Sequence, residues 1–351
     1  MYKLTQNQSL SLESMRGVSA IMVVLCHSFQ VFIARYASDF FSYIVMIAQA
    51  SVMVFFVLSG FLIGKSIQSN IHLNKKFNSL VYFKSRLIRI YPPLLLSIIL
   101  VYFLAFFAPY FFESKDILLK NTDSWIESIN LQFSSNQIIS ALTFTNGILP
   151  VSTPFNTPLW SLPLEVWYYI IAGLFCTRKI ALVILSIFLF IILSSAKYEF
   201  FIYSFVWLSG LVSSFVSPRS KLALKFYLCM ICVLTMLCIN KGYEYHTGEN
   251  TIHYYNLFFG LSCCSFIYVF VIHFDKKIKI LPSTSKYSYT LYVIHIPIMI
   301  FMVGIFESYV LFSFSISFLL AILSVSICML TSWYCSKFVE NKKRIYKLIS
   351  Q

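Results

Sequence analysis

Charge is scarce in this sequence. Only 11% of its 351 residues are charged, whereas 59% are hydrophobic, and the mean hydropathy is +0.78. A soluble globular domain carries about 25% charged residues, so that class is excluded. Apolar runs of about 20 residues recur along the chain, and each is long enough to cross a bilayer. The composition predicts an all-α, polytopic membrane protein with a single transmembrane domain over residues 1–351 and no appended soluble domain.

Short segments of alternating hydrophobicity are missing, which argues against a β-barrel and for a helical bundle. Internal repeats and a cleavable signal pattern are also missing, so the first apolar run is expected to be a retained span. We expect about ten spans, at residues 15–34, 43–64, 91–112, 158–176, 179–195, 199–217, 222–240, 252–273, 287–306 and 310–336.

Acidic residues are few: 13, against 27 lysines and arginines, which gives a net charge of +14. On a ten-span topology the basic residues sort to one side, and only Arg35, Lys115, Lys120, Lys197 and Lys241 fall on the other. The positive-inside rule then predicts that both termini are cytoplasmic. The excess charge is a topology signal, because a nucleic-acid footprint would need a soluble, exposed basic face. No nucleic-acid partner is expected.

The nine cysteines all fall inside the expected spans. Cys229 and Cys232 have C-x-x-C spacing, but no second pair or nearby histidine completes a zinc or redox site. We interpret the cysteines as small packing residues and expect neither a metal site nor a bound cofactor.

Two ionisable residues stand out because they lie inside apolar runs, where an unpaired charge costs several kcal/mol. They are His27 and Glu165. At 1.5 Å per helical residue, His27 lies roughly 18 Å and Glu165 roughly 20 Å from the cytoplasmic side, so the two could meet at one level. A carboxylate beside an imidazole orients a general base. The alternatives are a helix-packing hydrogen bond for His27 and a structural pairing with a membrane arginine for Glu165.

Five short motifs occur in order along the chain. They are Arg16-Gly17 followed by His27, then Phe55 to Leu62, Arg86 to Pro92, Trp160 to Tyr169, and Ser288 to Pro297. Together they resemble the acyltransferase-3 family of integral-membrane acyltransferases, from about residue 11 to residue 344. Two positions depart from the family pattern. Lys84-Ser85-Arg86 stands where two adjacent basic residues are common, and Glu340-Asn341-Lys342 replaces a common Glu-x-Pro, which puts that terminal contact in doubt.

The resemblance implies a transfer of an acyl group, most often acetyl, to a hydroxyl of a cell-envelope carbohydrate. The donor is cytoplasmic acyl-CoA, here expected to be acetyl-CoA. The acceptor is an O-antigen, capsule or exopolysaccharide, free or lipid-linked. The expected location is the bacterial cytoplasmic (inner) membrane, with membrane lipid as a further partner. In this reading His27 and Glu165 are catalytic.

Three arginines near cytoplasmic span ends are candidates for binding acyl-CoA: Arg16, Arg86 and Arg89. Acyl-CoA carries several phosphates, and the planar guanidinium binds phosphate through two parallel hydrogen bonds. Arg86 and Arg89 share a face if their segment is helical, and Tyr91-Pro92-Pro93 is expected to break or redirect the chain after them. The alternative is plain topology anchoring, which we accept for Lys75 and Lys76.

Other candidates rest on single features. At 1.5 Å per helical residue, His295 lies less deep in the membrane than His27. It either lines an acyl-CoA tunnel or packs against neighbouring helices. Acceptor or channel roles are assigned to Ser59, Trp160, Ser161 and Tyr168. Ser59-Gly60 suits close helix approach, Trp160 also suits an interfacial belt, and Ser161 lacks a G-x-S-x-G elbow, which favours direct transfer over an acyl-serine. The outer connector 113–157 is expected to form a partial lid.

A second function class remains open. A transporter of a carbohydrate or lipid-linked sugar would use His27 and Glu165 as a proton relay. Transporters often show inverted repeats, and the sequence has none, which favours the enzyme.

Overall fold

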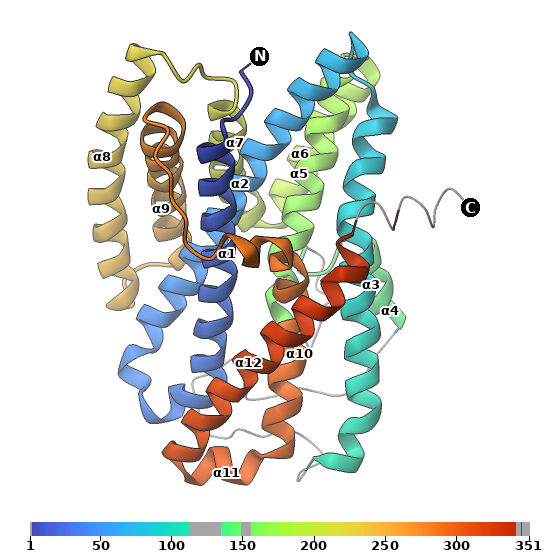
Figure 1. Ribbon diagram of the computed structural model, residues 1–351, viewed down its shortest axis with the longest axis vertical. Helices are drawn as coiled ribbons and strands as arrows, with labels where there is room; N and C mark the ends of the chain where they lie inside the picture. Colours follow the sequence, from blue (N-terminus) through green and yellow to red (C-terminus); the bar gives the residue numbers. More distant parts are fainter. Residues whose placement is uncertain (1, 113–134, 149–155, 342–344, 346–351) are drawn as a thin grey trace. The chain divides into compact units, whose positions relative to one another are not determined.

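The computed structural model describes residues 2–112, 135–148, 156–341 and 345. Within these residues the chain is helical and contains no strand (Figure 1). It divides into two compact units. The first unit comprises Met1–Ser19, Gln49–Leu87 and Leu162–Ser285, and the second comprises Ala20–Ala48, Ile88–Ser161 and Lys286–Gln351. Most of the connector expected to form a lid, residues 113–134 and 149–155, lies outside the described residues.

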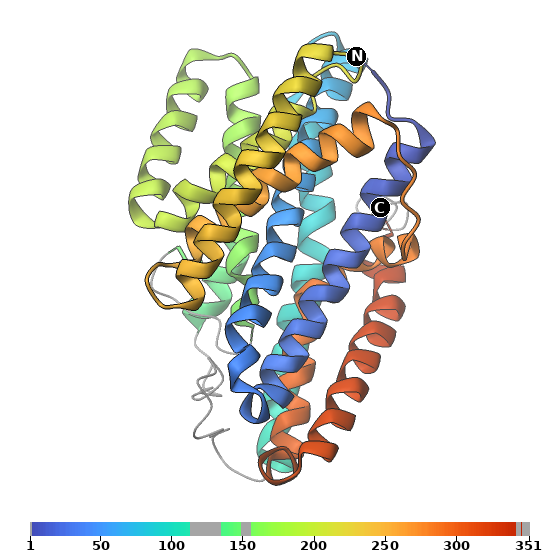
Figure 2. The ribbon, with the colours of Figure 1, turned by 90° about the vertical axis from the view of Figure 1, so that its left-hand side faces the viewer.

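The first unit is built mainly from the middle of the chain. It holds the start of α1 (Gln6–Ser28), most of α2 (Phe41–Asn74), the start of α3 (Ser79–Phe111), α5 (Ser161–Cys176), α6 (Ile180–Ala196), α7 (Tyr198–Ser213), α8 (Lys221–His246) and α9 (Ile252–Phe266), which continues as a π-helical turn, Ile267–His273. A 3-10 turn, Pro282–Lys286, follows. Helix α9 packs between α8 and α7, and α7 also packs on α6 (Figure 2).

Helices α2 and α7 approach each other through glycines. A Cβ on Gly60 would collide with the Trp207 carbonyl, and a Cβ on Gly210 would collide with the Val57 carbonyl. Small residues let two backbones approach this closely in a membrane. The close approach that Ser59-Gly60 predicted is therefore confirmed, and it brings the Ser59 side chain against α7.

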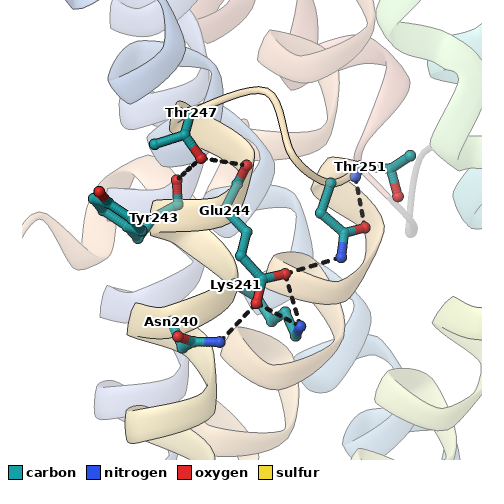
Figure 3. Close-up of polar contacts among 7 residues, drawn as sticks. Asn240, Lys241, Tyr243, Glu244, Thr247 and Thr251 are labelled. Atoms are coloured by element: carbon teal, nitrogen blue, oxygen red, sulfur yellow. Dashed lines mark hydrogen bonds and ion pairs between the residues drawn. The ribbon is translucent and has the colours of Figure 1, made fainter.

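The end of α8 is fixed by one carboxylate (Figure 3). Glu244 accepts hydrogen bonds from Asn240 Nδ2 at 2.7 Å, from Lys241 Nζ at 2.7 Å and from Asn250 Nδ2 at 2.9 Å. Gly248 takes the positive φ of +79° at the turn into α9, a conformation that glycine adopts without steric cost. Local side-chain contacts thus set the short α8–α9 connection.

The second unit surrounds the end of α1. After Ser28 the chain forms a π-helical turn, Phe29–Ile33, then two 3-10 turns, Ala34–Tyr36 and Ser38–Phe40. The unit further contains most of α3, α4 (Ser135–Leu142), a 3-10 turn at Thr157–Trp160, α10 (Ser288–Ile305), α11 (Glu307–Phe312) and α12 (Phe314–Val339). Helices α10 and α12 run side by side (Figures 1 and 2), and both pack on the π-helical turn.

Seven helical segments in the described residues are long and apolar enough to cross a membrane. They begin at Gln6, Ser38, Ser79, Lys221, Ile252, Ser288 and Phe314. The remaining expected spans correspond to α5, α6 and α7, which have 16, 17 and 16 residues. At 1.5 Å per residue these are about 25 Å long, shorter than a hydrocarbon core of about 30 Å. A polytopic helical membrane protein is confirmed, whereas the count of ten spans and the cytoplasmic termini stay predictions.

The predicted break at Pro92-Pro93 was wrong. Helix α3 continues from Ser79 to Phe111 with Pro92, Pro93 and Pro109 inside it. Proline removes a backbone donor, but membrane helices tolerate it where neighbouring helices and local adjustments satisfy the freed carbonyls.

Candidate active site

His27 lies in the last turn of α1, directly before the π-helical turn. Its Nδ1 is 2.9 Å from Oε1 of Gln30, which belongs to that turn and is buried. With the amide oxygen as acceptor, Nδ1 carries the proton and Nε2 is the basic nitrogen. His27 keeps some accessible surface. Single π-helical turns occur often at functional sites, and this one carries Gln30, the hydrogen-bond partner of the imidazole.

A second histidine lies beside the first. The rings of His295, on α10, and His27 are 5.3 Å apart between centroids, inclined by 31°. His295 is fully buried, and its Nδ1 donates to the Leu291 carbonyl at 3.0 Å. Its Nε2 has no hydrogen-bond partner among the described residues. His295 was expected to lie less deep than His27, but the two rings are adjacent. The second unit therefore contains a pair of imidazoles.

A buried serine also lies in this unit. The Ser161 hydroxyl is 2.6 Å from the Tyr292 hydroxyl. The centroids of the Tyr292 and His295 rings are 6.1 Å apart. Asn156 donates to the Val293 carbonyl at 2.7 Å, which ties the segment before Ser161 to α10. These contacts place Ser161 next to the helix that carries His295.

In the first unit, Glu165 is the end of a directional chain of hydrogen bonds. Trp207 Nε1 donates to the Ser59 hydroxyl at 3.2 Å, and that oxygen is 2.7 Å from the Tyr169 hydroxyl. Tyr169 donates to the Glu165 carboxylate, one turn earlier on α5. A chain of hydrogen bonds that ends on a carboxylate orients it. Ser59, expected at an acceptor or channel position, is part of this chain.

The structure does not test whether His27 and Glu165 meet. His27 belongs to the second unit and Glu165 to the first. The pairing of the two as base and orienting carboxylate stays a prediction.

Arg16 owes its position to its neighbour. A Cβ on Gly17 would come within 2.7 Å of the Leu281 carbonyl oxygen and 3.2 Å of Thr284 Cβ. Glycine therefore lets α1 lie directly against the segment 281–285. Arg16, half-buried, directly precedes Gly17 at that contact.

Arg86 and Arg89 both lie on the helical part of α3, three residues apart, as predicted. Arg86 Nη2 donates to the Ser66 hydroxyl on α2 at 3.1 Å, and its guanidinium lies 5.8 Å from the centre of the Tyr82 ring. Both arginines keep accessible surface. Their role in binding acyl-CoA stays a prediction.

The two remaining acceptor candidates have different surroundings. Tyr168 is buried, donates to the Phe200 carbonyl at 2.6 Å and packs against Phe56 and Trp207, which favours a packing role. Trp160 is half-buried in the 3-10 turn before α5.

Glu340 makes a contact although Lys342, and not proline, stands two residues after it. Its Oε1 accepts from the backbone N of Thr290 at 2.9 Å and from the Thr290 hydroxyl at 2.6 Å. The carboxylate thereby caps the first turn of α10, where a negative charge is favourable.

Sequence reasoning missed several contributors. Gln30 and Tyr169 could have been found from spacing, because they follow His27 by three residues and Glu165 by four, on the same helix face. Tyr292, which contacts Ser161, and Trp207, which donates to Ser59, come from helices distant in sequence and have no local signal. In the described part of the chain, no group of three or more His, Cys, Asp or Glu side chains could hold a metal ion.

The fold and these two groups of side chains define a polytopic helical membrane protein with two adjacent histidines in one unit and a hydrogen-bonded carboxylate in the other. Comparison with known families gives one match: the acyltransferase domain of the acyltransferase-3 family, over residues 9–333. The chain belongs to this family and is a membrane acyltransferase. No curated protein and no solved structure matched the chain.

Proposed function

We propose that this protein is an O-acetyltransferase that moves the acetyl group of acetyl-CoA to a hydroxyl of an envelope polysaccharide in the bacterial inner membrane. The observation that carries the proposal is the 2.9 Å contact between Gln30 Oε1 and Nδ1 of His27. With Nδ1 engaged by Gln30, Nε2 of the imidazole can accept a proton. A sugar hydroxyl is a poor nucleophile until its proton is removed, and a neutral imidazole is suited to that task.

In the proposed reaction, His27 carries the proton from the acceptor to the leaving group, and every bond that breaks is matched by one that forms. Nε2 of His27 takes the proton of the acceptor hydroxyl as its oxygen attacks the thioester carbonyl. The new C–O bond forms, the C–S bond breaks, and the imidazolium returns the proton to the departing CoA thiolate. The products are an acetyl ester and CoA. Direct transfer needs no acyl-serine, and Ser161 remains an acceptor-side candidate.

His295 joins the reacting centre in this proposal. Its Nε2 is a buried acceptor without a described partner, beside the ring that becomes charged. Glu165, Arg16, Arg86 and Arg89 keep their proposed roles, the first as orienting carboxylate and the others as ligands of the CoA phosphates.

Acetyl-CoA labelled in the acetyl group tests the proposal. The purified protein, supplied with envelope glycan from its own host, should release CoA thiol and place label on the glycan in equal amounts. Alkali should release that label as acetate, because the product is an ester. If the protein moves glycan across a vesicle membrane without consuming thioester, it is a transporter and the proposal is wrong.

A further inference from the structure

The ammonium of Lys65, on α2, is buried, and its Nζ has no hydrogen-bond acceptor among the described residues. None of the ion pairs found there involves it. Its nearest aromatic neighbours are the ring of Tyr2, with the centroid 3.3 Å from Nζ, and that of Phe61, at 5.7 Å.

The aromatic rings do not provide hydrogen-bond acceptors for this ammonium. A ring face attracts a cation, but it offers no lone pair to the three N–H donors of lysine. The Tyr2 hydroxyl is likewise buried without a hydrogen-bond partner in the described part of the chain. Burial raises the pKa of the Tyr2 phenol above its ordinary value, so the hydroxyl stays protonated and remains a donor. Two buried donors, one of them charged, therefore belong to one cluster that has no acceptor among the described residues.

The neighbouring contact suggests which acceptor is missing. Ser66, the next residue on α2, accepts the hydrogen bond from Arg86. Lys65 and the serine that binds Arg86 are thus consecutive residues of α2, and they lie on different faces of the helix. An anion with several oxygen atoms satisfies such donors, and phosphate is the anion that lysine and arginine commonly bind.

We propose that Lys65 and Tyr2 form a phosphate-binding subsite, in which the ammonium and the phenol donate to one phosphate group. The subsite deepens the proposed function, on which its assignment to acyl-CoA rests. The Tyr2 ring shields Nζ in this structure, so phosphate binding requires the N-terminal arm, residues 2–5, to shift. A lipid headgroup offers the same chemistry, and the experiment separates the two sources.

The test measures CoA binding to the purified full-length protein in detergent by titration calorimetry. Lys65→Gln removes the charge and should weaken CoA binding about tenfold or more, because charge-assisted hydrogen bonds are the strong ones. Lys76→Gln is the matched control: it removes the same charge from an exposed position just beyond the end of α2, and should change affinity less than twofold. Tyr2→Phe keeps the ring and removes only the hydroxyl, and should weaken CoA binding severalfold.

Repeating the titration with 3′-dephospho-CoA identifies the group. If Lys65→Gln no longer matters there, the 3′-phosphate occupies the subsite; if the loss persists, the pyrophosphate does. The lipid arm measures retention of phosphatidylglycerol by native mass spectrometry. A loss of retained lipid with unchanged CoA affinity assigns the same phosphate chemistry to a headgroup.

The proposal is overturned if Lys65→Gln matches Lys76→Gln with CoA, with 3′-dephospho-CoA and with phosphatidylglycerol. Should Lys65→Gln fail to fold, Tyr2→Phe decides the result, with equal binding in all arms counting against the subsite. The proposed function fails separately, when wild-type protein consumes no acetyl-CoA. If the wild type transfers acetyl groups while Lys65→Gln matches Lys76→Gln in all three binding measurements, the subsite is removed and the proposed function stands.

Discussion

At the scale of single residues, two short helical spacings hold the candidate reactive groups. Gln30 follows His27 by three residues, and Tyr169 follows Glu165 by four, so each partner lies on the same helix face. The sequence predicted His27 and Glu165 because ionisable groups are costly in apolar spans. It could not predict that His295 lies beside His27, because that contact depends on how α10 packs against the end of α1.

Gln30→Ala tests the support of His27. Without the acceptor on Nδ1, the imidazole can take either tautomer and rotate, so we expect turnover to fall at least about tenfold while CoA affinity stays unchanged. The measurement is the initial rate of acetyl transfer at saturating acetyl-CoA. Full turnover in this variant would show that Gln30 does not orient the base.

Tyr169→Phe tests the chain that ends on Glu165. The variant keeps the ring and removes the donor to the carboxylate, so we expect a rate loss of about tenfold if Glu165 acts in transfer. Tyr168→Phe is the neighbouring control, since it removes only the bond to the Phe200 carbonyl and should stay near wild-type activity. If Tyr169→Phe transfers acetyl groups as fast as the wild type and Tyr168→Phe do, Glu165 lies outside the reaction.

At the scale of helices, close approach depends on a few small residues. Gly60 and Gly210 bring α2 and α7 together, and Gly17 brings α1 against the segment 281–285. The sequence indicated the first of these through Ser59-Gly60, but it wrongly predicted a break at Pro92-Pro93. Proline chemistry alone suggests a break, whereas the packing that lets a membrane helix continue is not visible in a single sequence.

Gly210→Ala should separate α2 from α7. The added methyl group meets backbone atoms of α2, which cannot rotate away, so we expect a destabilisation of about 1–3 kcal/mol or more. Thermal unfolding in detergent would report it as a lower midpoint. Leu208→Ala, at a side chain that is 41% exposed on the same helix, is the control and should shift the midpoint little. A Gly210→Ala midpoint equal to that of the control would contradict the tight contact.

At the scale of the whole molecule, the membrane arrangement follows from composition and charge. Low charge and long apolar runs predicted a polytopic helical protein, and the structure confirms that class. The number of spans is less accessible to sequence, because α5, α6 and α7 are apolar but shorter than the bilayer core is thick.

Cysteine labelling tests the predicted sides of the membrane. Glu249 follows α8, and Lys277 lies beyond the helical segment Ile252–His273, so one span separates them. On the positive-inside topology, Glu249→Cys should react with an impermeant maleimide in intact cells, and Lys277→Cys only after permeabilisation. The unsubstituted chain supplies the background from native cysteines. The opposite pattern would invert the topology.

The central claim is that His27 is the base for acyl transfer, and His27→Ala in purified protein tests it most directly. The account predicts a loss of acetyl transfer of about 10²-fold or more, with CoA affinity and thermal stability near those of wild type. A loss below about tenfold, in a variant that binds CoA and unfolds normally, would contradict it.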